Sequence, residues 1–406
     1  MINIIGLGYI GLPTALMFAK SGIKVVGTDN NEKLVETLTN GELTFDEEGL
    51  EELFNEALNN GIQFVTDYRK TNTYIIAVPT PYIKESKKLD PKYVISAVNS
   101  VLDVCVKGSL IIIESTISPG SIDKYVRPEV EKRGLVIGQD VHLVHAPERI
   151  IPGNMIYELE HNSRTIGADD FEIGEKVKKL YSSFCKAEIV LTDIASAEMS
   201  KVVENTYRDI NIAFANELTK ICRKDNRDVY EIIKIANRHP RVNILQPGPG
   251  VGGHCISVDP WFLVGDYPDL TNLILTARKI NDSMPTHVLG RIRDIMRLHD
   301  IKDISKIGIY GLTYKENVDD TRESPTIQLL ERMDEHLAFG VKVFDPMVRT
   351  RIVDHQFMNF EDFINEIEVL VIMVGHDHIK MNMDLIKEKH VLDTRNVCTF
   401  ESCYKL

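Results

Sequence analysis

The feature that most constrains the fold is a glycine-rich turn at the start of the chain. An apolar run, Ile2–Ile5, leads directly into Gly6-Leu-Gly8-Tyr-Ile-Gly11. In a strand–turn–helix unit the first glycine permits the tight turn, the second lets the backbone approach a pyrophosphate, and the third lets the helix pack on the strand. The spacing therefore predicts a parallel-sheet unit that binds a dinucleotide at a helix N-terminus.

Glycine patterns of this kind also occur in purely structural turns, so the acidic residue that follows is important. The next apolar run, Lys24–Thr28, ends at Asp29, where the ribose-binding acid of such units belongs. A carboxylate accepts hydrogen bonds from a ribose 2′-hydroxyl and repels a 2′-phosphate, so NAD is favoured over NADP. The alternative is that Asp29 only caps the strand end.

Two polar turns follow later apolar runs and are candidates for further contacts with the cofactor. Thr80 and Thr116 come after the runs Tyr74–Val78 and Leu110–Glu114. The carboxyl ends of parallel strands meet at one edge of a sheet, which is where a nicotinamide would lie. Each threonine can equally be a local cap.

The pattern along the whole chain predicts an α/β protein with two doubly wound, Rossmann-like domains joined by a central helical domain. Short β-branched runs alternate with helical patterns up to about residue 194, and this alternation returns from Lys306. Between them, Ala195–Lys224 contains no Gly or Pro and has apolar residues at helical spacing, which predicts one long helix. We expect domains at 1–194, 195–290 and 291–406. The expected strands are Ile2–Ile5, Lys24–Thr28, Tyr74–Val78, Leu110–Glu114, Val141–His145, Lys306–Tyr310, Val341–Phe344, Leu370–Val374 and Val391–Asp393.

Charge and composition exclude several classes of partner. The formal net charge of −13 argues against a general nucleic-acid binder, which needs a basic surface. No apolar run approaches the roughly 20 residues that span a bilayer, and we expect neither a signal peptide nor a membrane partner. The six cysteines are scattered without a C-x-x-C pair, so we expect neither a disulfide framework nor a metal site, and a cytoplasmic location.

A loop dense in Gly and Pro, Gln246–Cys255, presents a candidate nucleophile. Most isolated cysteines are small core residues, but Gly-Val-Gly-Gly precedes Cys255 closely and Asp259 follows it. Such a backbone can approach a ligand and present a thiolate to it. His254 is a weaker candidate for a base because adjacent side chains often point apart.

The predicted long helix carries a polar stripe. Lys201, Asn205 and Arg208 have i, i+4, i+7 spacing and share one face. A basic stripe is commonly a solvated surface, but an Asn between Lys and Arg fits a face that lines a ligand site. The opposite face is apolar, with Met199, Val203, Ile210 and Phe214.

These motifs together resemble the UDP-glucose/GDP-mannose dehydrogenase family over nearly the whole chain. The resemblance rests on the glycine turn and on further motifs spread over all three expected domains. They are Gly6–Gly11, Glu114-Ser-Thr116, Pro147-Glu-Arg149, Lys201-x-x-x-Asn205, Gly252-Gly-His-Cys255-x-x-x-Asp259, Gly311-Leu-Thr-Tyr-Lys315 and Asp320-Thr-Arg322-Glu-Ser-Pro.

The resemblance implies roles for particular residues. NAD would be held by Gly6, Gly8, Tyr9, Ile10, Gly11, Asp29, Lys33, Thr80, Thr116 and Arg322. A UDP-linked sugar would be held by Arg149, Ile150, Lys201, Asn205, Arg208, His239, Arg241, Gly252, Tyr314, Lys315 and Arg395. The catalytic group would be Cys255, Lys201, Asn205, Asp259 and Glu148.

The implied reaction oxidises a CH₂OH group to a carboxylate. It removes four electrons, so two NAD are used per sugar. Cys255 would add to the intermediate aldehyde as a thiohemiacetal and then form a thioester that water cleaves. Lys201 and Asn205 would stabilise the developing oxyanion, while Asp259 and Glu148 would position water or orient Lys201.

Within the family, three segments look most like members that act on UDP-N-acetylmannosamine. They are His145–Gly153, Arg208–Leu218 and Ala236–Gly250. Members specific for UDP-glucose usually carry Pro-Glu-Phe-Leu where this chain has Pro147–Ile150, which argues against glucose. UDP-N-acetylglucosamine remains the second choice, and a nucleotide-sugar sensor without turnover is the alternative of a different class.

The apolar face of the long helix predicts self-association. Such a surface commonly pairs with its own copy across a two-fold axis, so we expect a homodimer or a higher oligomer built from it. The resemblance further implies that Arg241 acts in the neighbouring subunit's sugar site. The alternative is that Arg241 serves its own subunit or caps the preceding helix.

Overall fold

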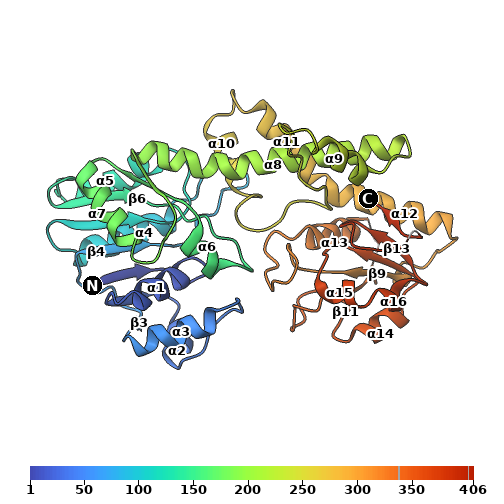
Figure 1. The fold of residues 1–406 in the computed structure, drawn as a ribbon, viewed down its shortest axis with the longest axis horizontal. Coiled ribbons are helices and arrows are strands. Elements are labelled where there is room, and N and C mark those ends of the chain that lie inside the picture. Colours follow the sequence, from blue (N-terminus) through green and yellow to red (C-terminus); the bar gives the residue numbers. More distant parts are fainter. Residues whose placement is uncertain (337–338, 401) are drawn as a thin grey trace. The chain divides into compact units, whose positions relative to one another are not determined.

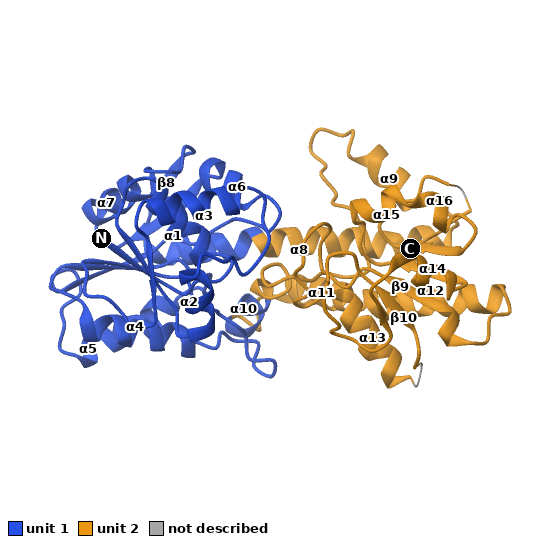
Figure 2. Cartoon of the chain, turned by 90° about the horizontal axis from the view of Figure 1, so that it is seen from below, with its two compact units in different colours: residues 1–204, 261–266 blue, residues 205–260, 267–406 orange. Residues whose placement is uncertain are grey.

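The computed structural model describes residues 1–336, 339–400 and 402–406. The chain forms two compact units (Figure 2). Unit 1 comprises Met1–Glu204 and Trp261–Asp266, and unit 2 comprises Asn205–Pro260 and Tyr267–Leu406. Each unit is built around its own sheet, mostly parallel in unit 1 and parallel in unit 2, as the two regions of alternating pattern predict (Figure 1).

The sheet of unit 1 has the strand order β3-β2-β1-β4-β5-β6-β7-β8. The pairs from β3 to β6 are parallel, β6 and β7 pair antiparallel, and β7 and β8 are parallel again. The strands are β1 Ile2–Ile5, β2 Val25–Thr28, β3 Gln63–Val65, β4 Thr73–Ile76, β5 Ser109–Ile113, β6 Val141–His145, β7 Arg164–Ala168 and β8 Ile189–Thr192. The helices are α1 Gly11–Lys20, α2 Glu32–Thr39, α3 Leu50–Asn59, α4 Lys92–Val104, η1 Ile122–Val126, α5 Arg127–Lys132, α6 Met155–His161 and α7 Phe171–Tyr181.

Unit 2 contains a second doubly wound sheet in the order β11-β10-β9-β12-β13-β14, with parallel pairing throughout that order. Its strands are β9 Ile307–Tyr310, β10 Lys342–Phe344, β11 Gln356–Phe357, β12 Val369–Ile372, β13 His390–Asp393 and β14 Tyr404–Lys405. The helices beside it are α13 Pro325–Glu335, α14 Phe360–Asn365, α15 Asp377–Met381 and α16 Met383–Ile386, with a 3₁₀ turn, η2 Ile304–Lys306. β9 and β12 are fully buried, as strands covered on both faces should be.

The predicted long helix is α8, Ile194–Lys224. The helices that follow are α9 Val229–Ala236, α10 Asp259–Asp266, α11 Asn272–Asp282 and α12 Met284–Leu298. A buried polar cluster joins α8 to α11, in which Asp209 accepts hydrogen bonds from Arg278 at 2.6 Å and from Asn281 at 2.8 Å. Because a buried charge is costly unless it is paired, this cluster fixes the register of the two helices. Among the described residues, no helix is long and apolar enough to cross a membrane.

Candidate active site

The glycine turn after β1 separates glycines that the fold requires from one that it does not. A Cβ on Gly6, which has φ of +90°, would lie 2.4 Å from the Ala77 carbonyl oxygen, and one on Gly11 would lie 1.8 Å from the Gly6 oxygen. At Gly8, by contrast, no described atom lies within 4 Å of the Cβ position. The open side of Gly8, next to the N-terminus of α1, therefore fits the pyrophosphate of NAD.

Asp29 both fixes this turn and faces the expected ribose position. One carboxylate oxygen accepts the Leu7 N–H at 2.9 Å, and the other accepts the Asn31 N–H at 2.9 Å. The residue thus has the structural role of a strand-end cap. Each carboxylate oxygen has a second acceptor position, so the cap does not prevent a bond to a ribose hydroxyl.

The other expected NAD contacts in unit 1 differ in exposure. Tyr9 is half-buried and its ring stacks on Phe45 with a centroid distance of 4.4 Å. Thr80 is buried and Thr116 half-buried, in the turns after the neighbouring strands β4 and β5. Ile10 is half-buried in the glycine turn itself, while Lys33 is exposed on α2.

Glu148 belongs to a buried ionic cluster. It pairs with the Arg164 guanidinium, and its other oxygen accepts the Arg149 N–H at 2.6 Å. Arg164 also contacts Glu114 at 3.4 Å, and the Tyr181 hydroxyl donates to Glu114 at 3.0 Å. Because both oxygens of Glu148 are engaged, its arrangement suits the positioning of the Pro147–Ile150 segment.

Glu114 is a functional candidate that sequence reasoning passed over, although it begins the Glu114-Ser-Thr116 motif. Burial raises the pKa of Glu114 to about 7, against the opposing effect of Arg164. Its Oε2 atom has no hydrogen-bond partner among the described residues. A periodicity argument assigns Glu114 to a strand end, and only the fold shows that β7 brings Arg164 beside it.

The two residues after Glu148 are both held by unit 1. The Arg149 guanidinium donates to the Thr165 hydroxyl at 2.8 Å and pairs with Glu204 at 2.7 Å. The Ile150 side chain is buried in the core of the unit, so a contact from Ile150 to a ligand would come from its backbone. Their predicted roles in sugar binding stay predictions.

In unit 2, the loop that leads to Cys255 packs closely on the segment after β9. A Cβ on Gly252 would lie 2.6 Å from the Glu323 oxygen and 2.7 Å from the Tyr314 Cβ. Gly253 has φ of +81°, and its N–H donates to the Arg322 carbonyl at 3.0 Å. The glycines are therefore required for close approach, and Cys255 lies exposed at the end of the loop.

Asn205 and Asp259 are joined directly. The Asn205 amide donates to the Asp259 carboxylate at 2.6 Å, and both side chains are buried. The Asp259 N–H donates to the Cys255 carbonyl at 2.8 Å, so one short network links α8, the start of α10 and the residue that carries the thiol. This brings together three of the predicted catalytic residues.

The predicted polar stripe on α8 is uneven in burial. Lys201, one turn before Asn205, is only 6% exposed, whereas Arg208 is exposed. The helix therefore buries two of the three side chains of the stripe, and the role of the stripe in ligand binding stays a prediction. The buried Lys201 and Asn205 fit the part of the stripe assigned to catalysis.

The second sheet repeats the turn of the first. Gly311, with φ of +96°, donates its N–H to the Phe344 carbonyl at 2.8 Å, as Gly6 does to Thr28. Asp345 then accepts the Leu312 N–H, as Asp29 accepts that of Leu7. Sequence reasoning missed Asp345, although an Asp at the end of the second strand was available as a signal.

Asp345 and His376 hold the segment that carries Tyr314 and Lys315. Asp345 also accepts the Thr313 N–H at 3.1 Å, and His376 Nδ1 accepts the Asn317 N–H at 2.9 Å. Burial acts to raise the pKa of Asp345, but hydrogen bonds from His376 and the backbone leave it below its usual value. Tyr314 and Lys315 are half-buried on this fixed turn.

Two predicted arginines of unit 2 are engaged with nearby acids. Arg322 binds Asp320 through two nitrogens, with the shortest contact at 2.6 Å. Arg395 lies 3.6 Å from Glu316, and its Nη1 atom is 2.7 Å from the Cβ position of Gly248. Arg395 therefore lies against the glycine- and proline-rich loop, as a residue of the same ligand site would.

The predicted sugar-binding residues His239 and Arg241 are exposed in the segment after α9. The Asn237 side chain exchanges two hydrogen bonds with the backbone of Ile244, at 2.9 and 2.8 Å. The Asn211 side chain on α8 likewise binds the backbone of Asn243. This anchoring holds both ends of the segment, so that His239 and Arg241 project from a fixed turn.

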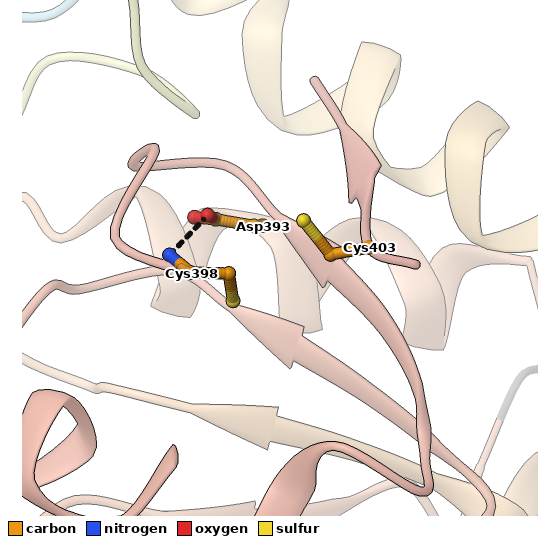
Figure 3. A group of neighbouring side chains, drawn as sticks. All are labelled: Asp393, Cys398 and Cys403. Carbon is orange, nitrogen blue, oxygen red and sulfur yellow. Dashed lines mark hydrogen bonds between the residues drawn. The ribbon is translucent and has the colours of Figure 1, made fainter. Parts of the chain in front are cut away.

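A separate cluster lies at the end of the second sheet (Figure 3). Ligand atoms of Asp393, Cys398 and Cys403 lie within 4.8 Å of one another. The Asp393 carboxylate already accepts the Cys398 N–H at 2.8 Å and pairs with Lys405 at 3.0 Å. Because this ammonium compensates the carboxylate, we assign no metal to the cluster, and the prediction of no metal site stays a prediction.

Comparison with known proteins places this arrangement in a family. The models of the UDP-glucose/GDP-mannose dehydrogenase family match residues 1–185 as the NAD binding domain, 195–283 as the central domain and 308–400 as the UDP binding domain. The chain therefore belongs to this family of NAD-dependent nucleotide-sugar dehydrogenases. The cofactor is accordingly NAD, in agreement with Asp29 and the glycine turn.

Several similar proteins span nearly the same length. The chain is 42% identical to the UDP-N-acetyl-D-mannosamine dehydrogenase of Methanocaldococcus jannaschii, over 98% of this chain and 93% of the relative. It is 37% identical to an NDP-N-acetyl-D-galactosaminuronic acid dehydrogenase of Ralstonia nicotianae, over 98% and 96%. The structure of the UDP-N-acetyl-mannosamine dehydrogenase of Staphylococcus aureus is similar with a TM-score of 0.89 and 41% identity, covering 100% of this chain and 97% of that one.

Proposed function

We propose that the protein oxidises UDP-N-acetyl-D-mannosamine at C6 to UDP-N-acetyl-D-mannosaminuronate, as a supplier of precursors for polysaccharides or other glycans. The observation that carries the proposal is the network of Asn205, Asp259 and the Cys255 backbone beside a loop that needs its glycines. The sugar assignment rests on Pro147-Glu-Arg149 and His239-Pro-Arg241, and on relatives named for this substrate. UDP-N-acetylglucosamine is the second candidate, and UDP-glucose is a weaker one.

The chemistry proposed for the chain's own residues uses the thiol of Cys255. When bound, NAD accepts a hydride at each of two oxidation stages. The Cys255 thiolate adds to the aldehyde carbon and forms a thiohemiacetal, whose oxidation leaves a thioester. Water then breaks the carbon–sulfur bond and releases the carboxylate and the free thiol.

The neighbouring residues support that chemistry by position and charge. Lys201 and the Asn205 amide stabilise negative charge on the sugar oxygen, and Lys201 is the candidate for proton transfer. Asp259 accepts the Asn205 amide at 2.6 Å, which directs the amide toward the sugar oxygen, and Asp259 is the candidate for positioning water. Glu148, bound to Arg164 and the backbone, acts as a positioning residue.

The site residues are proposed to divide between two ligands. NAD contacts Gly6, Gly8, Tyr9, Ile10, Gly11, Asp29, Lys33, Thr80, Thr116 and Arg322. The UDP-sugar contacts Arg149, Ile150, Lys201, Asn205, Arg208, His239, Arg241, Gly252, Tyr314, Lys315 and Arg395. The proposed domains are 1–194 for NAD, 195–290 for the long helix and the nucleophile loop, and 291–406 for the UDP-sugar. Cysteines that form no disulfide in the described part of the chain suit a reducing compartment, and we propose the cytoplasm.

A panel of substrates tests the assignment of the sugar. UDP-N-acetylmannosamine should release two NADH per sugar, while UDP-N-acetylglucosamine, UDP-N-acetylgalactosamine and UDP-glucose should give much lower kcat/KM. Absorbance at the NADH band measures turnover directly. A higher kcat/KM for UDP-N-acetylglucosamine would transfer the assignment to that sugar, and binding of every sugar without NADH release would favour the sensor.

Replacement of the thiol tests the covalent scheme. Cys255→Ala should retain binding of NAD and UDP-sugar and form no uronic acid, because the aldehyde lacks the nucleophile. Cys105→Ala, which removes a half-buried thiol of unit 1, is the matched control and should react like the wild type. Mass spectrometry of the sugar product decides, and uronic acid at the wild-type rate from Cys255→Ala would refute the scheme.

A further inference from the structure

A cavity of about 730 Å³ lies in unit 2, among helices that the proposed active site does not use. It is formed by the C-terminal part of α8, the end of α11, the first turns of α12, and α13. Its lining residues are Lys220, Arg223, Lys279, Asp282, Ser283, Thr286, His287, Gly290, Arg291, Asp294 and Arg332. None of them is assigned to NAD, to the UDP-sugar or to catalysis, and a small metabolite fits the volume.

The cavity is strongly basic in a chain that is acidic overall. Five lining side chains are Lys or Arg and two are Asp, which gives a formal charge of +3 against −13 for the whole chain. The two acids are already shared with other cations. Asp282 pairs with Arg278, and Asp294 is shared between Arg297 at 3.5 Å and Arg291 of the lining at 3.7 Å. Asp282 and Asp294 therefore do not neutralise all the basic side chains of the lining, which keeps an excess of positive charge.

Buried nitrogen atoms of the lining have unmet hydrogen-bonding capacity. The Arg291 side chain is buried, and one of its terminal nitrogens donates to the Lys405 carbonyl at 3.2 Å. Its Nε atom, however, is buried without a hydrogen-bond partner among the described residues, and so is the Nε2 atom of His287 one turn earlier. Buried polar groups are normally satisfied in native proteins, so these two nitrogens indicate that the cavity has a ligand-binding role.

Burial and neighbouring positive charges lower the pKa values of the basic side chains that line the cavity. Burial, followed by the charge of Arg223, lowers the pKa of Arg291 to about 10. Burial and three neighbouring cations lower the pKa of His287 to about 4, and burial lowers the pKa values of Lys220 and Arg223. A bound anion would reverse the repulsive part of these shifts.

The start of α12 adds a further attraction for negative charge. Its first turn, Met284-Pro-Thr-His287, contains no acidic residue, and Ser283, Thr286 and His287 line the cavity. The N-terminal end of a helix carries partial positive charge; in this turn Pro285 has no N–H and the His287 N–H donates to the Ser283 carbonyl at 3.0 Å, which leaves the Met284 and Thr286 N–H groups. Lys220 is held at this end by a 2.9 Å hydrogen bond to the Ser283 hydroxyl.

We propose that this cavity, the α8–α12 basic pocket, binds a small phosphate-bearing anion at a site separate from the nucleotide-sugar site. Arginine forks match the geometry of phosphate oxygens, and three arginines line the pocket. A diphosphate or a phosphorylated sugar has the charge to neutralise the excess of +3. The pocket is thus a second metabolite site on the enzyme.

Calorimetric titration of the full-length protein with pyrophosphate tests the proposal. The titration is run at physiological salt with saturating UDP, so that the nucleotide site is already filled. The wild type should bind one pyrophosphate per chain. Lys220→Gln combined with Arg223→Gln should weaken this binding at least about tenfold, since two of the five cations are lost.

The matched control removes the same charge next to the pocket. Lys224 and Arg227 are exposed and do not line the cavity, so Lys224→Gln with Arg227→Gln should change pyrophosphate affinity less than about twofold. Circular dichroism and binding of NAD show whether each variant is folded. Arg223→Gln alone, at an exposed position, serves as a second variant if the double variant does not fold.

Three results would overturn the proposal. They are absence of pyrophosphate binding by the wild type, equal binding by the pocket variant, and equal loss in the charge-matched control. A change of oligomeric state in the pocket variant without loss of pyrophosphate binding would instead assign the pocket to an acidic segment of a second copy. Calorimetric binding of pyrophosphate does not depend on catalytic turnover, so its result is independent of whether the proposed reaction is correct.

Discussion

At the scale of single residues, the Arg164 cluster places two carboxylates against one guanidinium inside unit 1. Glu148 makes the shorter contact with Arg164, while Glu114 lies 3.4 Å from it and has one oxygen without a hydrogen-bond partner among the described residues. One cation cannot fully compensate two buried carboxylates, so the less well paired of them takes up a proton more readily. This agrees with the raised pKa of Glu114, about 7.

The raised pKa of Glu114 predicts a stability that depends on pH. Between the ordinary value of 4.5 and about 7, the folded state holds a proton that the unfolded state has released, so stability falls as pH rises through this range. Glu114→Gln removes the titration. The melting temperature of Glu114→Gln minus that of the wild type should therefore increase from pH 5 to pH 8, by about 2–4 °C per kcal/mol.

Differential scanning fluorimetry across this pH range measures the difference in melting temperature between Glu114→Gln and the wild type. Glu175→Gln, at an exposed position of α7, is the control and should keep a constant difference from the wild type. If the difference in melting temperature between Glu114→Gln and the wild type does not change with pH, Glu114 stays ionised in the folded protein.

The choice of cofactor is a second prediction at this scale. The Asp29 carboxylate should make kcat/KM for NAD far higher than for NADP, because it would repel a 2′-phosphate. Asp29→Asn should reduce that ratio at least about tenfold through loss of the charge. Since Asp29 also accepts the Leu7 and Asn31 N–H groups, the melting temperature is measured alongside. Equal efficiency of the wild type with both cofactors would contradict the assigned role.

At the scale of elements, the turn between β1 and α1 contains one glycine that the fold requires, Gly11, and one that we expect only NAD binding to require, Gly8. Gly11→Ala should destabilise the protein strongly, because its Cβ would lie 1.8 Å from the Gly6 oxygen. Gly8→Ala should leave the melting temperature nearly unchanged, since its Cβ position is open, and should weaken NAD binding about tenfold or more. Fluorescence titration with NAD gives the affinity. Unchanged affinity in Gly8→Ala would place the pyrophosphate elsewhere.

The elements that sequence reasoning found are those with a strong pattern. β1, β2, β4, β5 and β6 follow near-continuous apolar runs, and α8 begins one residue before its predicted start, where Asp193 caps the Ser196 N–H. Most of the missed strands lack such a run, whereas β8, Ile189–Thr192, has a short apolar run that was not recognised. β3 has three residues, β11 and β14 have two each, and β7 begins with a charged residue, Arg164.

In the candidate site, too, features encoded by neighbouring residues could be predicted from the sequence, whereas contacts between distant residues could not. The glycine turn and the Cys255 loop could be predicted because their signals lie within a dozen residues. The Asn205–Asp259 bond and the support from Asp345 and His376 could not, because they join positions 54 and 31 residues apart. A motif fixes the type of a residue, whereas its partners depend on the tertiary fold.

At the scale of the whole molecule, α8 carries several large apolar side chains that are exposed in the described part of the chain. Val203, Tyr207, Phe214 and Ile221 are between 46% and 61% exposed, and they recur at spacings of four and seven along the helix. A continuous apolar stripe of this kind is typical of a helix that packs against another copy. We therefore expect a homodimer built on α8, and a higher assembly remains compatible with it.

The dimer makes a prediction about Arg241, which is exposed in the anchored segment after α9. If Arg241 acts in the partner's sugar site, chains with Arg241→Ala and chains with Cys255→Ala complement each other when coexpressed. In a mixed dimer one site then carries both lesions and the other carries neither. Activity of the purified mixed dimer should recover to about half of the wild type, while each variant alone stays inactive.

Two differently tagged chains, purified in sequence over both tags, isolate the mixed dimer for an NADH assay. If Arg241 serves its own subunit, every site in the mixed dimer carries one lesion and the preparation stays inactive. Arg238→Ala with Cys255→Ala is the matched control, since Arg238 is exposed three residues before Arg241. Arg238→Ala alone should remain active, and its mixed dimer should retain about half activity through the subunit with an intact thiol. Recovered activity in the mixed dimer of Arg241→Ala and Cys255→Ala chains would establish that the site is shared between subunits. If both residues acted within one subunit, neither site of that dimer would be intact.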